Sequence, residues 1–294
     1  MSTRSTTAVV EAHRGAGRFF DAAGVRSFVL DQGEGAPVVC LHGVPTSSFL
    51  YRKVVKELAT RDLRGIAFDL PGLGFAERPT DFDYTWSGLA RWTGAAIDAL
   101  GLDRVHLVVH DTGGPIGFEW AIRNPDRVLS ITVLNTVVDV AGFRRPWSMY
   151  PFSLRGVGEL WLMGMRPPMW GVLSRMIALA GQSEVSRAEI NAYCDLLKRE
   201  DSGRAFLRIM RGFERTQERQ DFFVQGLARR TYPAQVVWGG SDPVLGHDRR
   251  AAVQRALKLD TAVVLPAKHF LQEDQAPAIA DAVHDLAKNV SERG

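Results

Sequence analysis

A carboxylate stands at Asp111, within the segment LVVHDTGGPIG that covers residues 107–117. An apolar, strand-like run ends at this aspartate, and Gly113 and Gly114 follow it at once. A side chain on such a strand–turn–helix projects above the end of a sheet, where a nucleophile can reach a substrate. Asp111 is therefore either a nucleophile or a polar residue that begins a helix, since aspartate is also a common helix N-cap.

Two further residues with possible chemical roles occur late in the chain. Asp242 precedes Pro243 in GGSDPV, and His269 lies in PAKHF. Each has a structural interpretation, because Asp-Pro is a common turn and a histidine is often a half-buried, hydrogen-bonded residue. Together they would provide a base and the acid that orients it. We favour the functional interpretation, because the glycine turn, the acid and the histidine would otherwise have to coincide.

The elements that must position these residues alternate between strands and helices. Continuous apolar runs separated by helical patterns predict an α/β protein whose mainly parallel sheet is covered on both faces. Ligands of such sheets bind beyond the carboxyl ends of the strands, which is where Asp111, Asp242 and His269 fall. The predicted strands cover residues 17–22, 26–31, 37–43, 63–72, 105–111, 129–138, 234–244 and 260–270.

The alternation stops after Val138 and resumes near residue 234. The segment between has no clear strand and carries many Trp, Met and Arg residues in a spacing compatible with helices. A helical insertion that splits an α/β core is the simplest interpretation. It predicts three parts: a first core segment at 1–138, a helical cap at 139–225 and a second core segment at 226–294.

The composition excludes several classes of function. Lys and Arg number 36 against 33 Asp and Glu, and this small net charge of +3 gives no reason to expect nucleic acid or a membrane as a partner. The 2 cysteines make no disulfide framework. No metal constellation or phosphate-cradling loop is evident, so we expect no metal and no cofactor. The N-terminus lacks an apolar signal segment and no run could span a membrane, so the expected location is cytoplasmic.

Six segments carry a resemblance to a known family. They are LHGVPTSSFLYRKV, FDLPGLGFAERP, LVVHDTGGPIGFEWA, RNPDRV, GSDPVLG and PAKHFLQE. In them the chain resembles the aspartate-nucleophile branch of the α/β-hydrolase superfamily, most closely the haloalkane dehalogenases and next the epoxide hydrolases. The resemblance implies the α/β-hydrolase fold, in which helices flank a mainly parallel eight-stranded sheet and an inserted helical cap covers it.

The resemblance also implies a hydrolase that works in two steps. Asp111 would attack an sp³ carbon and displace a halide, which leaves a covalent alkyl–aspartate ester. His269 would then activate water toward that ester, and Asp242 would orient His269. Asn135 occupies the position where part of the family carries this acid, but an amide holds no charge. The implied partners are a small apolar organic substrate and water.

The groups expected to stabilise the leaving atom depart from the family pattern. The resemblance assigns the oxyanion hole to the backbone N–H groups of Val44 and Thr112. Haloalkane dehalogenases usually have tryptophan after the nucleophile and often asparagine after the HG pair, where this chain has Thr112 and Val44. The Thr112 hydroxyl is one replacement donor. Candidate contacts from the cap to a halide or substrate are Trp147, Trp161, Trp170 and Tyr150.

Two alternatives to dehalogenation stay open at this point. Epoxide hydrolases use the same triad, but the leaving oxygen needs a proton, usually from two cap tyrosines. Tyr150 and Tyr193 lie in the predicted cap, whereas GRAFLRIMRGF at 203–213, a place for one of that pair, contains none. The second alternative is a hydrolase-fold protein that binds a small ligand without turnover. The missing halide donors favour it, and the complete triad disfavours it.

Overall fold

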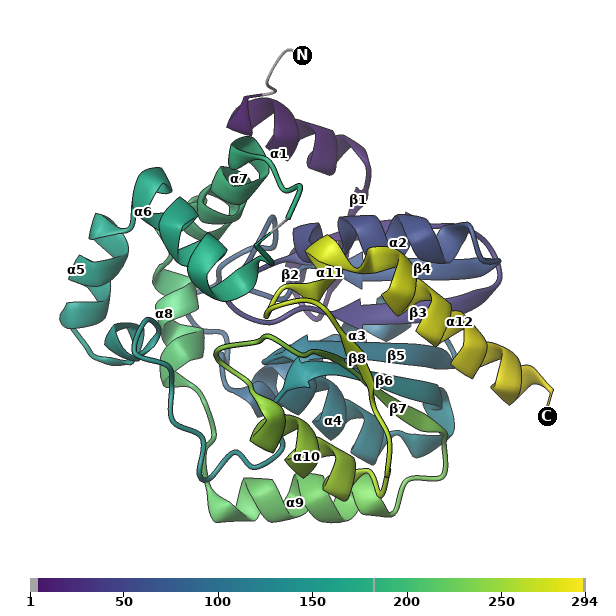
Figure 1. Cartoon of the computed structure of the whole chain (residues 1–294). Coiled ribbons are helices and arrows are strands. Elements are labelled where there is room, and N and C mark those ends of the chain that lie inside the picture. Colours follow the sequence, from purple (N-terminus) through teal and green to yellow (C-terminus); the bar gives the residue numbers. More distant parts are fainter. Residues whose placement is uncertain (1–4, 182, 293–294) are drawn as a thin grey trace.

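A central sheet of eight strands, in the order β1-β2-β4-β3-β5-β6-β7-β8, organises the protein (Figure 1). This computed structural model describes residues 5–181 and 183–292. The strands are β1 (Arg18–Ala22), β2 (Val25–Gln32), β3 (Ala36–Leu41), β4 (Leu63–Phe68), β5 (Val105–Asp111), β6 (Val128–Thr136), β7 (Ala234–Gly239) and β8 (Val263–Leu265).

The sheet is mainly parallel, as the sequence predicts. β2 runs antiparallel to both β1 and β4, and every neighbouring pair from β4 to β8 is parallel. Parallel neighbours require crossover connections, and helices on both faces provide them. Strands buried on both faces need apolar side chains in both directions, which explains the continuous apolar runs of β3 and β5.

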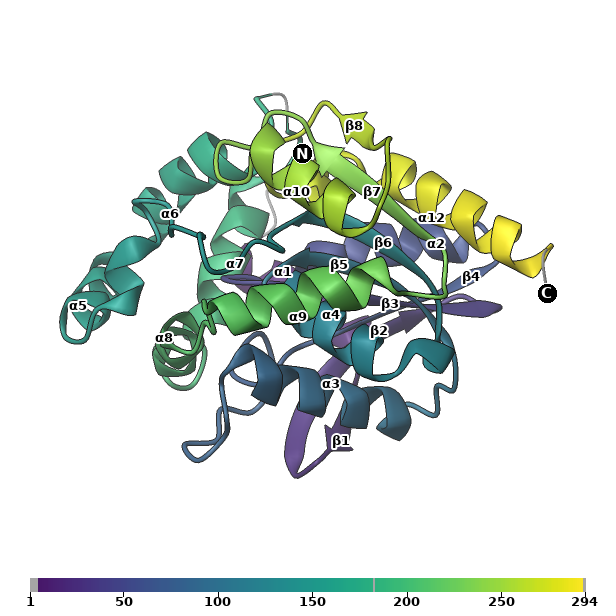
Figure 2. The same ribbon diagram turned by 90° about the horizontal axis from the view of Figure 1, so that it is seen from below.

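Helices cover both faces of the sheet (Figures 1 and 2). On one face, α2 (Arg52–Ala59) packs beside α12 (Ala276–Ser291). On the other face, α4 (Gly113–Arg123) packs between α3 (Trp86–Ala99) and α9 (Gln217–Ala228). The remaining helices outside the α5–α8 segment, defined below, are α1 (Thr6–Gly15), η1 (Ser48–Tyr51), η2 (Pro125–Arg127), α10 (His247–Ala256) and α11 (Leu271–Asp274).

Between β6 and β7 the chain leaves the sheet and forms a group of helices. The α5–α8 segment lies at the side of the molecule toward which β5 and β6 point (Figure 1). The chain then returns through α9, so the predicted boundary between residues 225 and 226 falls inside that helix. The segment comprises η3 (Tyr150–Ser153), α5 (Val157–Gly164), α6 (Pro167–Leu173), η4 (Ser174–Ala178), α7 (Arg187–Lys198) and α8 (Arg204–Arg211).

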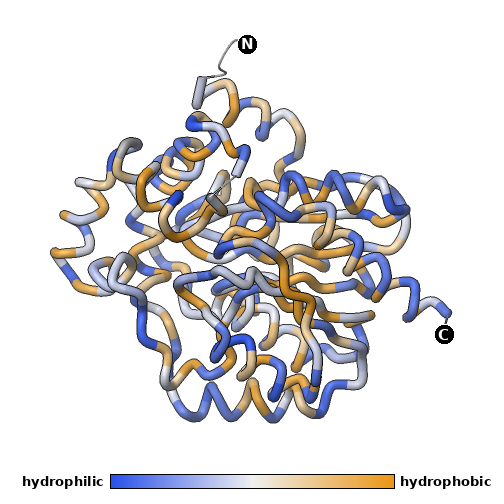
Figure 3. Tube along the Cα trace, viewed as in Figure 1, coloured by the Kyte–Doolittle hydropathy of each residue, from blue (hydrophilic) through white to orange (hydrophobic). Residues whose placement is uncertain are grey.

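Hydrophobic residues concentrate along the central strands, and the outer helices alternate between hydrophobic and hydrophilic positions (Figure 3). Burial of this apolar surface is the main force that holds the helices on the sheet. The polar residues that the sequence singles out are exceptions at the carboxyl ends of the strands. None of the helices within 5–181 and 183–292 is long and apolar enough to cross a membrane.

Candidate active site

Asp111 ends β5 in a strained backbone conformation. Its φ of 51° lies in the left-handed region, which costs a non-glycine residue ~1–3 kcal/mol. Two glycines make the turn possible: a Cβ on Gly113 would lie 2.4 Å from the carbonyl oxygen of Leu41, and one on Gly114 would lie 1.9 Å from Oγ1 of Thr136. The glycines let α4 start tightly against the sheet, and the sharp turn holds the Asp111 side chain above the sheet end.

The structure brings the three predicted triad residues together. Nε2 of His269 lies 3.5 Å from Oδ2 of Asp111, and its Nδ1 lies 2.7 Å from Oδ2 of Asp242. The backbone N–H groups of Val244 and Leu245 donate to the other Asp242 oxygen at 2.7 and 3.0 Å. The Asp242 side chain is fully buried, whereas that of Asp111 keeps 20% of its surface exposed. Asp111 is thus the carboxylate that a ligand can reach.

Asn135, the rival position for the acid, supports Asp242. Its Nδ2 donates to Oδ2 of Asp242 at 2.7 Å, and its Oδ1 accepts from the backbone N–H of Gly239 at 2.7 Å. Asp139, the next carboxylate after that strand, forms an ion pair with Arg249 instead. The carboxylate that pairs with Nδ1 of His269 is therefore Asp242, which follows β7, and not a residue that follows β6.

The charges of the triad stabilise one another. Burial opposes the charge on Asp111, but the hydrogen bond and charge of His269 outweigh it and lower the pKa of this carboxyl below its usual value. Burial likewise opposes a charge on His269, and the carboxylates of Asp242 and Asp111 outweigh it and raise the pKa of the imidazole. Loss of either carboxylate charge would therefore make His269 release its proton more readily.

His110, which directly precedes Asp111, helps to hold His269. Its Nε2 lies 2.9 Å from the backbone carbonyl oxygen of His269 and must carry the proton, since a carbonyl only accepts. Burial lowers the pKa of His110 to about 3, so this ring is neutral. Its position before the nucleophile was the only sequence signal for this role, and the partner lies 159 residues away.

Backbone donors meet the Asp111 carboxylate from the turn after β3. The N–H of Val44 donates to Oδ1 of Asp111 at 2.8 Å. The ring of His42 lies in the same turn: Nδ1 is 2.9 Å from the carbonyl of Gly43, and Nε2 accepts from the N–H of Leu70 at 3.0 Å. His42 therefore shapes the turn that presents Val44.

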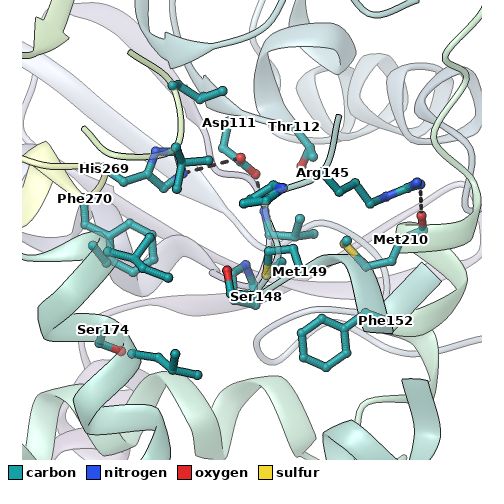
Figure 4. Close-up of a pocket in the computed structure, with 18 of the residues that line it drawn as sticks. Asp111, Thr112, Arg145, Ser148, Met149, Phe152, Ser174, Met210, His269 and Phe270 are labelled. Atoms are coloured by element: carbon teal, nitrogen blue, oxygen red, sulfur yellow. Dashed lines mark hydrogen bonds and ion pairs between the residues drawn. The ribbon is translucent and has the colours of Figure 1, made fainter. Parts of the chain in front are cut away.

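A largely apolar cavity opens above Asp111 and His269 (Figure 4). Its walls come from the ends of the strands, the connection after β6, the α5–α8 segment and the loop after β8, and they include Met149, Phe152 and Phe270. Thr112, adjacent to the nucleophile, also lines this cavity, and its buried hydroxyl has no hydrogen-bond partner in the described part of the chain. An apolar substrate with a reactive carbon fits such a pocket.

Of the four predicted cap contacts, the structure brings only Trp170 to the cavity, and its buried indole N–H has no hydrogen-bond partner within residues 5–181 and 183–292. Trp147 and Tyr150 are 66% and 54% exposed and do not line the cavity. Trp161 packs against the hydrophobic core. Helical spacing identifies an apolar face, but the packing of the segment on the sheet decides which residue reaches the cavity.

Most of the cavity wall was not predicted from the sequence, including two residues with polar groups. Trp86 begins α3 and lines the cavity, and its buried indole N–H has no hydrogen-bond partner among the described residues. Arg145, in the connection after β6, places a cation in the same wall. Neither had a sequence signal beyond its residue type, because both lie far along the chain from Asp111. Within 5–181 and 183–292 no cluster of three or more His, Cys, Asp or Glu side chains could hold a metal ion.

Comparisons with known proteins agree with this fold. The family model described as alpha/beta hydrolase fold matches residues 36–165. Haloalkane dehalogenase 2 of Mycobacterium tuberculosis is 29% identical over 280 residues, which is 90% of this chain and 93% of that protein.

Solved structures give the same result for the fold. Haloalkane dehalogenase DbeA from Bradyrhizobium elkani superposes with a TM-score of 0.79 at 23% identity, over 95% of this chain and 99% of that one. The epoxide hydrolase CorEH superposes with a TM-score of 0.80 at 21% identity, over 93% and 99%.

The parallel sheet, its strand order and the family match define the chain as a protein of the α/β-hydrolase fold. The proteins to which it is similar over most of its length include haloalkane dehalogenases.

Proposed function

We propose that this hydrolase cleaves a carbon–halogen bond of small organic substrates through a covalent ester on Asp111. One observation carries the proposal: a strained turn holds a reachable carboxylate 3.5 Å from Nε2 of a buried histidine, whose Nδ1 is paired with a second carboxylate at 2.7 Å. The likeness to haloalkane dehalogenases supports it.

In the first step an oxygen of Asp111 attacks the carbon that bears the halogen. The carbon–oxygen bond forms as the carbon–halogen bond breaks, and the halide leaves with the bonding electrons. Asp111 needs no base for this attack, because its lowered pKa keeps it ionised at neutral pH. The largely apolar lining of the cavity offers few groups that would hold water beside the carboxylate, which favours the displacement.

In the second step water attacks the carbonyl carbon of the Asp111 ester. Alkylation has removed the charge of Asp111, so the pKa of His269 falls and its Nε2 can accept a proton from water. Asp242 stabilises the imidazolium that forms. The N–H of Val44, which already contacts an Asp111 oxygen, is a natural donor to the oxyanion. Breakdown releases the alcohol and restores Asp111.

Three donors on residues that line the cavity, each buried without a hydrogen-bond partner among the described residues, are candidates to stabilise the departing halide. They are the hydroxyl of Thr112 and the indole N–H groups of Trp170 and Trp86. We propose that they replace the tryptophan that haloalkane dehalogenases usually carry at the position of Thr112. No tyrosine lines the cavity among the described residues, which disfavours protonation of an epoxide oxygen in the usual way.

The proposal is tested by trapping the ester in His269→Ala. The variant is incubated with a short series of bromoalkanes and, separately, with terminal and styrene-type epoxides, and its intact mass is measured. We expect a gain equal to the alkyl group without bromine. His247→Ala, which changes an exposed histidine, is the control and should show no stable adduct.

A mass gain equal to a whole epoxide would assign the protein to the epoxide hydrolases. Absence of any adduct, with ligand binding retained in the folded variant, would overturn covalent catalysis on these substrates. A protein that binds its ligand without turnover would then be the better description.

A further inference from the structure

Arg145 lies in the wall of the cavity, at a distance from the reacting end. Its side chain runs away from Asp111 and His269 toward α8, where the guanidinium donates to the backbone carbonyl of Met210 (Figure 4). The guanidinium carbon also lies 4.8 Å from the ring centre of Phe213. These contacts hold the cation on the side of the cavity that faces α8, away from Asp111 and His269.

The charge of Arg145 has no counter-charge among the described residues. No described carboxylate lies within 4.0 Å of it, and its buried Nε has no hydrogen-bond partner. Other partly buried arginines near this segment differ, because Arg219 pairs with Glu119 and Arg249 pairs with Asp139. An uncompensated cation in an apolar wall is costly unless a ligand supplies the missing charge.

A second cation strengthens the positive potential at this end of the cavity. Burial and, after it, the charge of Arg215 lower the pKa of Arg145 to about 10, so Arg145 stays charged at neutral pH. Arg215 itself donates to the carbonyl of Phe143 and pairs with no described carboxylate. The guanidinium groups of Arg145 and Arg215 thus attract an anion toward this end.

We propose that Arg145 binds the carboxylate of an amphipathic substrate whose far carbon reacts with Asp111. The inference rests on the proposed function and names its substrate class: halogenated alkanoic acids with the halogen distant from the acid group. The negative charge of Asp111 would repel a carboxylate beside it, so the acid must lie at the Arg145 end. The apolar wall between, with Met149 and Phe152, would contact the methylene chain.

The reaction balances as in the proposed function. Asp111 displaces bromide from the terminal carbon of an ω-bromoalkanoate, and water hydrolyses the ester. The products are an ω-hydroxyalkanoate, bromide and a proton. A guanidinium–carboxylate pair is bidentate and charge-assisted, and it is stronger than a neutral hydrogen bond.

The test compares kcat/KM for ω-bromoalkanoates of four to ten carbons with kcat/KM for their methyl esters. In the wild type we expect kcat/KM to be higher for the acid than for its methyl ester over one range of chain length. Arg145→Gln should lower the ratio of acid to ester by roughly ten- to a hundredfold, since it removes a hydrogen bond to a charged group. Arg145→Lys keeps the charge and should keep more of the ratio than Arg145→Gln.

Arg144→Gln is the matched control, because this neighbouring arginine is exposed and lies outside the cavity wall. It should leave the ratio as in the wild type. Equal losses for acid and ester in Arg145→Gln, or no preference for any acid in the wild type, would overturn the inference.

A second measurement does not depend on turnover. Binding of unreactive alkanoates and of alkan-1-ols of equal length is measured by calorimetry on the wild type and Arg145→Gln. If the wild type binds the alkanoate more tightly than the alkanol, and Arg145→Gln does not, the anion subsite is supported. Failure to release bromide would count against the proposed function and not against this subsite. Equal binding of acid and alcohol overturns the subsite.

Discussion

Replacement of Asp242 by asparagine keeps the shape of the side chain but removes its charge and one hydrogen-bond acceptor. The amide oxygen of Asp242→Asn can still accept from the N–H groups of Val244 and Leu245, which now bond Oδ1 at 2.7 and 3.0 Å. The amide NH₂ would then face Nδ1 of His269, where Oδ2 lies at 2.7 Å. His269 would lose both its acceptor and its counter-charge.

The size of the effect follows from this geometry. Opposite unit charges centred about 4 Å apart attract by ~4 kcal/mol at an effective dielectric constant of about 20. Because the imidazolium forms during ester hydrolysis, that step should slow by roughly 10³-fold. The same change in serine-protease triads costs about 10⁴ in kcat. Attack by Asp111 needs no base, so alkylation should slow by less than about tenfold.

The assay mixes enzyme with an excess of a bromoalkane, quenches at intervals and measures intact mass and released bromide. We expect Asp242→Asn to release about one bromide per active site rapidly and then to persist as the alkyl ester. Asp248→Asn, at a fully exposed carboxylate on α10, should behave as the wild type. Because Asn135 contacts Asp242 directly, adding Asn135→Asp should restore part of the hydrolysis rate.

The reasoning is refuted if the ester of Asp242→Asn hydrolyses within tenfold of the wild-type rate. It is also refuted if alkylation slows as much as hydrolysis does. The first result would mean that the charge of Asp242 does not assist the base. The second would mean that the acid acts on the nucleophile, and not on the water-activating step.

Three more outcomes are expected. As the pH falls from about 8 to about 5.5, the rate of alkylation should stay constant, because the lowered pKa of Asp111 keeps this carboxylate ionised. Protonation of His269 should slow hydrolysis of the ester over the same range. Accumulation of the ester as the pH falls, measured by intact mass, tests this expectation. Gly43→Ala would place a Cβ 2.2 Å from Oδ1 of Asp111 and should reduce alkylation at least tenfold, while Gly142→Ala, with open space around it, should not. Thr112→Val should slow halide release by roughly ten- to a hundredfold if its hydroxyl stabilises the leaving group, and bromide burst kinetics that match the wild type would exclude that role.

Much of the fold can be predicted from the sequence, because the strands and helices depend on local patterns of apolar residues. Continuous apolar runs between helical patterns predict a parallel sheet, and the structure confirms it. The last predicted strand, at 260–270, is shorter in the structure: β8 covers Val263–Leu265, at an edge where only one neighbour pairs with it. The length of a strand depends on its pairing with a neighbouring strand. A local sequence pattern does not show this pairing, so it overestimates the length of an edge strand.

The candidate triad was also proposed from the sequence, for a physical reason. Residues that follow successive parallel strands meet at one end of the sheet, so chain position alone predicts that Asp111, Asp242 and His269 lie near one another. Their catalytic roles stay a prediction until the ester is trapped. The support from Asn135 and His110 was not predicted, since hydrogen-bond direction depends on side-chain orientation.

The cavity wall was decided by tertiary structure. The sequence identified an insertion rich in Trp and Met, but not which side chains face the nucleophile. Trp170 reaches the cavity, whereas Trp147 is exposed, and Trp86 and Arg145 enter from elements that carried no motif. The sequence by itself determined the parallel sheet and the residues at its strand ends, because strand periodicity is local. Only the packing of the α5–α8 segment on that sheet decided what surrounds them, because such contacts join residues that no short pattern connects.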